Sequence, residues 1–212
     1  MTTLYLTRHG ETVWNTQKRM QGWNDSPLTE LGVKQAKWLG ERLEKEIIDV
    51  IYASPSGRAF KTAEIVRGNK NIEIIPRDNL REINMGNLEG KDQECLMREY
   101  ENEIHNFWNA PSVYVPCNGE TFTEVQDRAV EEIMNIAKEN EGKNILVVTH
   151  TVVLKCFMAY VNNQPIDKIW DPPYTHQTSL TKVEIDGNDI KVIMHADTSH
   201  HKEVKDKNAG GF

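Results

Sequence analysis

The chain has 212 residues, with 25 Lys and Arg against 32 Asp and Glu, so its formal net charge is −7. This acidic balance, without a basic run, argues against nucleic acid or an anionic membrane surface as a partner. Hydrophobic residues make up 38% of the chain and charged residues 27%, which is typical of a globular protein and not of a disordered one. The length suits one domain, and we expect residues 1–212 to form it. The net charge by itself also argues against an anionic substrate.

Three further features restrict the class of protein. No stretch approaches the about 18 consecutive apolar residues of a membrane-spanning helix. Residues 1–12 include Arg8 and Glu11, where a signal peptide has an apolar run. Cys95, Cys117 and Cys156 are odd in number and lack the spacing of a metal site, so we expect free thiols in a reducing compartment. These features predict a cytoplasmic protein.

Strand-like and helix-like segments alternate along the chain. In chain order we expect a strand at Thr3–Thr7, a helix at Leu28–Glu46, a strand at Asp49–Ala53, a helix at Ser56–Arg67, a strand at Ile72–Pro76, a helix at Thr121–Asn140, a strand at Asn144–Thr149 and a helix at Thr151–Val161. Thr178–Ile185 and Asp189–His195 flank the turn signal Asp186-Gly187-Asn188 and predict a closing antiparallel hairpin. This order predicts an α/β fold with a mostly parallel sheet and an antiparallel edge.

The region from Gly90 to Gly119 interrupts the alternation. Lys91–Ile104 is a predicted helix, and aromatic residues and prolines follow it. We expect residues 90–119 to be a helical insertion that folds over the sheet as a lid. Residues 202–212 are polar and include a Gly-Gly pair, so we expect a frayed tail there.

Four cationic or ionisable side chains come directly after predicted strands. Arg8 and His9 follow the first strand, Arg58 lies just past the second, and His150 ends the strand Asn144–Thr149. Ligands of open α/β sheets bind beyond the carboxyl ends of the strands. One such His is usually structural and one such Arg is usually a surface ion pair, but four clustered cations repel one another unless an anion lies between them. A phosphate dianion suits this arrangement, because guanidinium groups and helix N-termini both donate to it.

Five blocks of sequence, in a fixed order along the chain, resemble a known family. They are Arg8-His9-Gly10-Glu11-Thr12 with Trp14-Asn15 and the segment from Gln21-Gly22 to Thr29, then Ser54-Pro55 with Arg58-Ala59, then Leu80-Arg81-Glu82 with Gly86 and Glu89-Gly90, then Gly119-Glu120-Thr121, then Val148-Thr149-His150. Together they resemble the histidine phosphatase superfamily, which includes the cofactor-dependent phosphoglycerate mutases. The resemblance implies a phosphoglycerate-mutase-like three-layer sandwich, with helices on both faces of a mostly parallel sheet and an antiparallel edge strand.

The resemblance also implies a role for each matching residue. His9 would be the nucleophile that takes the phosphoryl group, and Glu82 the general acid and then the general base. Arg8, Arg58 and His150 would hold the phosphate oxygens, and Asn15, Gln21 and Gly22 would complete the pocket. Thr151 stands where the family usually has Gly, so its side chain would narrow the pocket or donate to phosphate. No metal and no cofactor is implied, because two guanidiniums and an imidazolium can neutralise the transferred group.

Several residues keep an alternative reading. Glu82 could be an exposed loop carboxylate paired with Arg81. Glu11 and Asp25 could be catalytic, or could organise Arg8 or cap a helix. His195, Asp197, His200 and His201 suggest a metal cluster at first sight, but no second group of ligands with metal-site spacing accompanies them. Trp108, Tyr114, Trp170 and Tyr174 are core residues or walls of a substrate pocket. The roles of His176 and Gln177 stay open.

The third block decides between mutase and phosphatase. Mutases of this type carry Glu-Arg-His-Tyr-Gly there and further basic residues in the insertion, whereas this chain has Glu82-Ile83-Asn84-Met85-Gly86 and an acidic insertion. The chain looks most like the broad-specificity phosphatase branch. We therefore predict a metal-independent phosphomonoesterase that acts on small-molecule phosphate esters and releases inorganic phosphate. Its leaving-group pocket is expected to include Leu96, Met97, Phe107, Trp108 and Tyr114, and Val152 is expected to affect its breadth. The alternatives are a cofactor-dependent phosphoglycerate mutase and a non-catalytic module that binds phosphorylated ligands; the sequence does not predict the oligomeric state.

Overall fold

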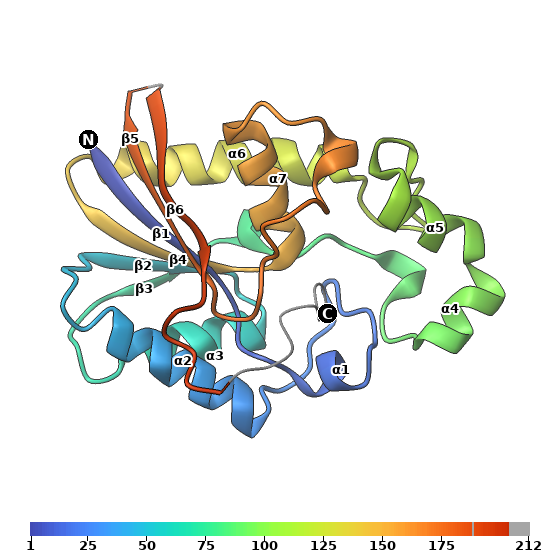
Figure 1. Cartoon of the computed structure of the whole chain (residues 1–212), viewed down its shortest axis with the longest axis horizontal. Coiled ribbons are helices and arrows are strands. Elements are labelled where there is room, and N and C mark those ends of the chain that lie inside the picture. Colours follow the sequence, from blue (N-terminus) through green and yellow to red (C-terminus); the bar gives the residue numbers. More distant parts are fainter. Residues whose placement is uncertain (188, 204–212) are drawn as a thin grey trace.

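The computed structural model, which describes residues 1–187 and 189–203, is built around one six-stranded sheet (Figure 1). Its strands are β1 (Thr2–Arg8), β2 (Val50–Ala53), β3 (Ile74–Pro76), β4 (Asn144–Thr149), β5 (Leu180–Asp186) and β6 (Asp189–Asp197), in the order β3-β2-β4-β1-β5-β6. The first four are parallel, β5 runs antiparallel to β1, and β6 runs antiparallel to β5. The predicted parallel sheet with an antiparallel edge is confirmed.

Helices cover both faces of this sheet, so the predicted three layers are also confirmed (Figure 1). The helices are α1 (Val13–Thr16), α2 (Glu30–Arg42), α3 (Gly57–Arg67), α4 (Gln93–Glu99), α5 (Glu101–Asn109), α6 (Phe122–Glu139) and α7 (Thr151–Val161). Helices α2 and α3 pack on the face that includes Leu146 and Val148 of β4. Helices α6 and α7 pack on the face that includes Ile145 and Val147. Successive β4 side chains thus enter opposite cores, which explains why this strand is apolar along nearly its whole length.

The pairing of β1 with β4 is the feature that builds the site. Arg8 is aligned with Thr149, and the His9 N–H donates to the Thr149 carbonyl at 3.0 Å. His9 and His150 therefore leave neighbouring parallel strands at the same edge of the sheet. Their imidazole ring centres lie 5.2 Å apart. The expectation that these two strand ends meet is confirmed.

The segment after Gly90 differs from its predicted form. We expected one helix at Lys91–Ile104, but the chain forms α4 and α5, separated at Tyr100, whose φ of −140° and ψ of 35° are not helical. On the two sides of this break, Leu96 of α4 and Ile104 and Phe107 of α5 belong to one apolar cluster with the start of α6 and with α7. These two helices lie beside the end of the sheet rather than on either face (Figure 1).

Some helices begin or end at residues other than the predicted ones. Helix α2 begins at Glu30 because the hydroxyl of Thr29 caps it by accepting from the Gly32 N–H at 3.0 Å, and it ends at Arg42 rather than Glu46. Helix α1 was not predicted, because its single turn depends on a capping box between Thr12 and Asn15.

Asn188 of the predicted turn and residues 204–212 of the predicted tail lie outside the described residues. Within the described part of the chain, none of the helices combines the length and the apolar character needed to cross a membrane.

Candidate active site

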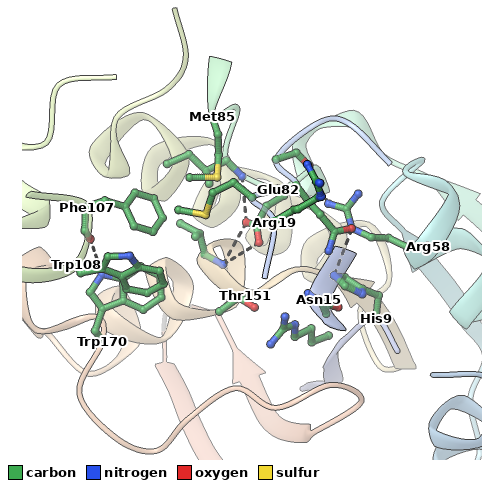
Figure 2. A pocket seen from close by; sticks show the side chains of 16 residues that line it. His9, Asn15, Arg19, Arg58, Glu82, Met85, Phe107, Trp108, Thr151 and Trp170 are labelled. Carbon is green, nitrogen blue, oxygen red and sulfur yellow. Dashed lines mark hydrogen bonds between the residues drawn. The ribbon is translucent and has the colours of Figure 1, made fainter. Parts of the chain in front are cut away.

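A pocket lies at the carboxyl edge of the sheet, between the strand ends and α5. Its polar residues are Arg8, His9, Asn15, Arg19, Gln21, Gly22, Arg58, Glu82 and Thr151, and its apolar residues are Met20, Ile83, Met85, Phe107, Trp108, Val152 and Trp170. Figure 2 shows His9 and Arg58 at one side, Phe107, Trp108 and Trp170 at the other, and Glu82 between them. Of the predicted catalytic and phosphate-binding residues, all except His150 line this pocket.

His9 is held as a neutral imidazole with a defined tautomer. Its Nδ1 lies 2.7 Å from the Gly10 carbonyl oxygen, which can only accept, so Nδ1 carries the proton. Its Nε2 accepts from the Arg58 Nε–H at 3.3 Å, so the Nε2 lone pair is directed toward that guanidinium (Figure 2). Burial lowers the pKa of His9 well below its ordinary value, and the charges of Arg58 and Arg8 lower it further. A neutral imidazole with a lone pair at the pocket is a competent nucleophile.

The Arg58 side chain is 1% exposed and is fixed by a turn from elsewhere in the chain. Its guanidinium donates to the carbonyls of Gly22 at 2.7 Å and Asn24 at 2.8 Å, and to the Asp25 carboxylate at 3.0 Å. Gly22 has a φ of +56°, and a side chain there would collide with Glu89, so this turn requires glycine. Asp25 thus organises Arg58 rather than Arg8, and the Glu11 carboxylate accepts from the capping hydroxyl of Thr29 at 3.0 Å.

Arg8 and His150 are also buried and only partly paired. The Arg8 Nη1 donates to the Thr175 carbonyl at 3.1 Å, while its Nε has no hydrogen-bond partner among the described residues. Burial lowers the pKa of Arg8 to about 10. The His150 Nε2 lies 2.8 Å from the Ser54 hydroxyl, its Nδ1 is unpaired within the described structure, and burial lowers its pKa well below the ordinary value. An acidic chain therefore contains one locally positive, buried site, which overturns the argument from net charge against an anionic ligand.

Glu82 faces the pocket as a carboxyl group that is harder to ionise than usual. It accepts from the backbone N–H of Ile83 at 3.0 Å and from that of Val152, in the first turn of α7, at 3.1 Å. Burial raises its pKa, although these N–H groups and the Arg58 and Arg8 charges oppose the shift. The alternative that Glu82 pairs with Arg81 is wrong, because Arg81 bonds Asp78 at 3.0 Å.

Thr12 joins two further predicted residues. Its hydroxyl accepts from the Gln21 side-chain amide at 2.7 Å, and the Asn15 side-chain oxygen accepts from the Thr12 N–H at 3.0 Å. The Gln21 side-chain oxygen is buried and has no partner in the described residues. This small network holds Asn15 and Gln21 on the pocket wall next to His9.

The predicted leaving-group contacts need correction. Phe107 and Trp108 line the pocket, but Leu96 and Tyr114 are buried in the core and Met97 is 53% exposed. Tyr114 packs against Phe107 and Phe122 instead, with ring centres 5.3 and 5.6 Å away. Leu96 and Tyr114 belong instead to the apolar cluster that includes Phe107 and Phe122.

Trp170 and Arg19 are two of the pocket residues whose positions the sequence did not determine. Trp170 follows a 3₁₀ turn after α7, and its Nε1–H donates to the Phe107 carbonyl at 2.7 Å while its ring lies 4.6 Å from that of Trp108. Arg19 donates to the Gly90 carbonyl at 2.6 Å and lies 4.0 Å from Asp92. Trp170 was one of four candidate aromatics, and Arg19 lies between Asn15 and Gln21, outside the quoted blocks, so neither gives a local signal of its position.

The suspected metal cluster does not form in the described residues. No group of three or more His, Cys, Asp and Glu there could hold a metal ion. His200 and His201 instead contact the backbone oxygen and the hydroxyl of Thr178, each at 3.0 Å.

Comparison with known proteins agrees with this geometry. The family model of the histidine phosphatase superfamily (branch 1) matches residues 4–198. Phosphoserine phosphatase 1 of Hydrogenobacter thermophilus is 33% identical over 170 residues, which cover 80% of this chain and 81% of that protein. A probable phosphoglycerate mutase GpmB of Yersinia pestis is 33% identical over 165 residues, covering 78% and 77%. The solved structure of Bacillus stearothermophilus YhfR has a TM-score of 0.93 and 49% identity, covering 94% of this chain and 99% of that one. The chain belongs to the histidine phosphatase superfamily, with a phosphoglycerate-mutase-like fold.

Proposed function

We propose that this protein is a phosphomonoesterase that works through a phosphohistidine on His9. The observation that carries the proposal is the neutral His9 imidazole, whose Nε2 accepts from the buried Arg58 guanidinium in a pocket that also contains Arg8 and Glu82. The similarity to a protein named phosphoserine phosphatase supports hydrolysis, and residues 4–198 match the model of the histidine phosphatase superfamily.

The first step is phosphoryl transfer to His9. When phosphate binds, the Arg58 Nε–H moves from Nε2 of His9 to a phosphate oxygen. The freed Nε2 lone pair attacks phosphorus, the P–O ester bond breaks, and the Glu82 carboxyl gives its proton to the leaving oxygen. The raised pKa of Glu82 favours the protonated form that this step needs. Arg8 and Arg58 supply the positive charge for the transferred oxygens, with His150, Asn15, Gln21, Gly22 and Thr151 completing the phosphate site. We propose that this charge makes a metal ion unnecessary.

The second step is hydrolysis of the phosphohistidine. Water attacks phosphorus and gives a proton to the Glu82 carboxylate, the N–P bond breaks, and inorganic phosphate leaves. His9 and Glu82 then return to their starting protonation states, so atoms and protons balance over the cycle.

The substrates that this pocket suits are small phosphate esters with an apolar or aromatic leaving group. Phe107, Trp108 and Trp170 form an aromatic wall opposite His9 (Figure 2). We propose that residues 90–119, which carry α4 and α5, act as a lid on a single catalytic domain. The described cysteines are free thiols, which suits our proposal that the enzyme acts in the cytoplasm.

Phosphoglycerate mutase activity is the second candidate, and Arg19 is the observation that favours it. A mutase must hold a second anionic group on its substrate, and Arg19 places a guanidinium on the pocket wall. Ile83 stands where the mutases carry an arginine, and its side chain is fully buried. Hydrolysis is therefore the better supported outcome.

The test combines trapping with turnover. Enzyme mixed with a labelled aryl phosphate in EDTA and quenched is expected to carry an acid-labile, base-stable phosphohistidine. We expect His9→Ala to carry no label and to lose turnover, while His105→Ala, on the exposed side of α5, serves as the matched histidine control. Full turnover by His9→Ala would contradict the proposal, and mutase flux with negligible hydrolysis would favour the second candidate.

A further inference from the structure

Arg128 lies on α6, outside the pocket, and uses every N–H group of its guanidinium. Its Nε and Nη2 donate to the two carboxylate oxygens of Glu120 at 2.7 and 2.8 Å. Its Nη1 donates to the carbonyls of Asn79 at 2.8 Å and Arg81 at 2.7 Å, and its Nη2 donates to the carbonyl of Glu82 at 3.0 Å. These bonds match the five N–H donors of a guanidinium, so the orientation of this side chain is fully determined.

Glu120 bonds the backbone on the other side of Glu82, at Asn84. Its carboxylate accepts from the Asn84 N–H at 2.7 Å, and its own N–H donates to the Asn84 carbonyl at 2.8 Å. Arg128 and Glu120 therefore fix the backbone on both sides of Glu82. The two side chains are 16% and 20% exposed, so water competes only weakly for these bonds.

The backbone of residues 79–84, to which Arg128 and Glu120 bond, needs such support because most of it lies outside regular secondary structure. After the 3₁₀ turn at Asp78–Leu80, residues 81–85 form no helix or strand. The Trp23 Nε1–H also donates to the Glu82 carbonyl, at 2.9 Å. The Glu82 carboxylate reaches the Val152 N–H only while this backbone stays in place.

We propose that Arg128, oriented by Glu120, is a positioning residue that holds the Glu82 carboxyl where it can transfer a proton. This inference rests on the proposed role of Glu82. It also gives a role to the Gly119-Glu120-Thr121 block, because Glu120 orients Arg128. Because Arg128 acts through Glu82, its loss must affect most strongly the substrates that depend on proton donation.

Two substrates test this dependence. Breaking the ester bond of p-nitrophenyl phosphate needs little protonation, whereas glycerol phosphate has a strongly basic leaving oxygen that needs the acid. A general acid contributes about 100-fold or more, so Arg128→Gln should lower kcat/KM for glycerol phosphate by about 100-fold and for p-nitrophenyl phosphate by far less. Arg128→Lys should recover part of the loss, and Glu120→Gln should shift the substrate ratio in the same direction. Arg77→Gln is the matched control, because Arg77 also binds carboxylates of α6, those of Glu132 and Glu139, without bonding the carbonyls at 79–82.

A double-mutant cycle with Glu82→Gln separates positioning from stability. If Arg128 acts through Glu82, Arg128→Gln in the Glu82→Gln background adds almost no further loss for glycerol phosphate. Should Arg128→Gln not fold, the Glu120→Gln and Arg128→Lys variants give the same comparison. Equal losses for both substrates, or full additivity with Glu82→Gln, would overturn the positioning role. Failure of the proposed function is seen separately, as a wild-type enzyme that forms no phosphohistidine on His9.

Discussion

The Nε–H of Arg58 donates to Nε2 of His9 across 3.3 Å, so a guanidinium contacts the atom that we propose as the nucleophile. This contact has two effects. It keeps the proton on Nδ1 of His9, and it places a positive charge where the phosphate oxygens would bind. The same contact opposes protonation of the imidazole, so the Arg58 charge adds to burial in lowering the pKa of His9.

Arg58→Lys tests whether catalysis needs the planar guanidinium with its several N–H donors, or only a positive charge at this position. Lysine cannot contact His9 and the carbonyls of Gly22 and Asn24 at once. Loss of one preorganised donor costs about 100-fold in kcat, and we expect at least that loss. Arg98→Lys, at an exposed arginine of α4, is the control and should retain wild-type kcat. A kcat within a few-fold of wild type in Arg58→Lys would show that charge alone suffices.

The pH profile should follow the two opposite pKa shifts. The phosphorylation step needs neutral His9, whose pKa is lowered, and protonated Glu82, whose pKa is raised. For glycerol phosphate, kcat/KM should therefore rise with pH through the His9 pKa and fall as pH rises through the Glu82 pKa. Glu82→Gln should remove the fall due to Glu82 along with most of the activity. An unchanged alkaline limb in that variant would assign it to another group, such as the phosphate of the substrate.

Trp108→Ala tests the aromatic wall. Trp108 and Trp170 pack with ring centres 4.6 Å apart on the pocket side opposite His9. Burial of an aromatic leaving group there is worth about 1.5 kcal/mol or more, so kcat/KM for naphthyl phosphate should fall by about tenfold. The value for glycerol phosphate should change much less. Val115→Ala, at a 72% exposed position in the same insertion, is the control, and equal losses for both esters would contradict a leaving-group contact.

Arg19→Gln tests whether the pocket recognises a second anionic group. A charge-assisted hydrogen bond contributes about 1.5–3 kcal/mol, so kcat/KM for 3-phosphoglycerate should fall by about tenfold or more. The value for p-nitrophenyl phosphate should remain close to that of wild type. Lys18→Gln, at the preceding exposed position, is the control. Equal effects on both substrates would contradict recognition of a second anionic group by Arg19 and would leave it only the structural bond to the Gly90 carbonyl.

Gly32→Ala tests the close approach of α2 to the loop after β1. A methyl group at Gly32 would collide with the Glu11 carbonyl oxygen, so the backbone next to His9 must move. We expect the free energy of unfolding to fall by about 1–3 kcal/mol, measured by chemical denaturation. Gly40→Ala is the control within the same helix, because its methyl group would lie 3.2 Å from the nearest atom, the Val66 carbonyl oxygen. A Gly32→Ala variant as stable as wild type would show that this loop adapts at no cost.

The sequence by itself determined the elements whose signal is local. Alternation of apolar runs and helical periodicity predicted the parallel strands β1 and β4 and the helix α7. Because residues that follow neighbouring parallel strands share one edge of a sheet, the meeting of His9 with His150 could also be predicted. The identity of Glu82 as the candidate acid came only from the family resemblance.

Tertiary structure decided the features that depend on packing between distant segments. The chain leaves the helical conformation at Tyr100, between Leu96 and Phe107, and both of these side chains enter the apolar cluster that also contains residues of α6 and α7. Trp170 reaches the pocket through its bond to the Phe107 carbonyl, and the raised pKa of Glu82 arises from burial against α7. The sequence carries residue types and local periodicity, whereas burial and hydrogen-bond partners between remote segments exist only once the chain has packed.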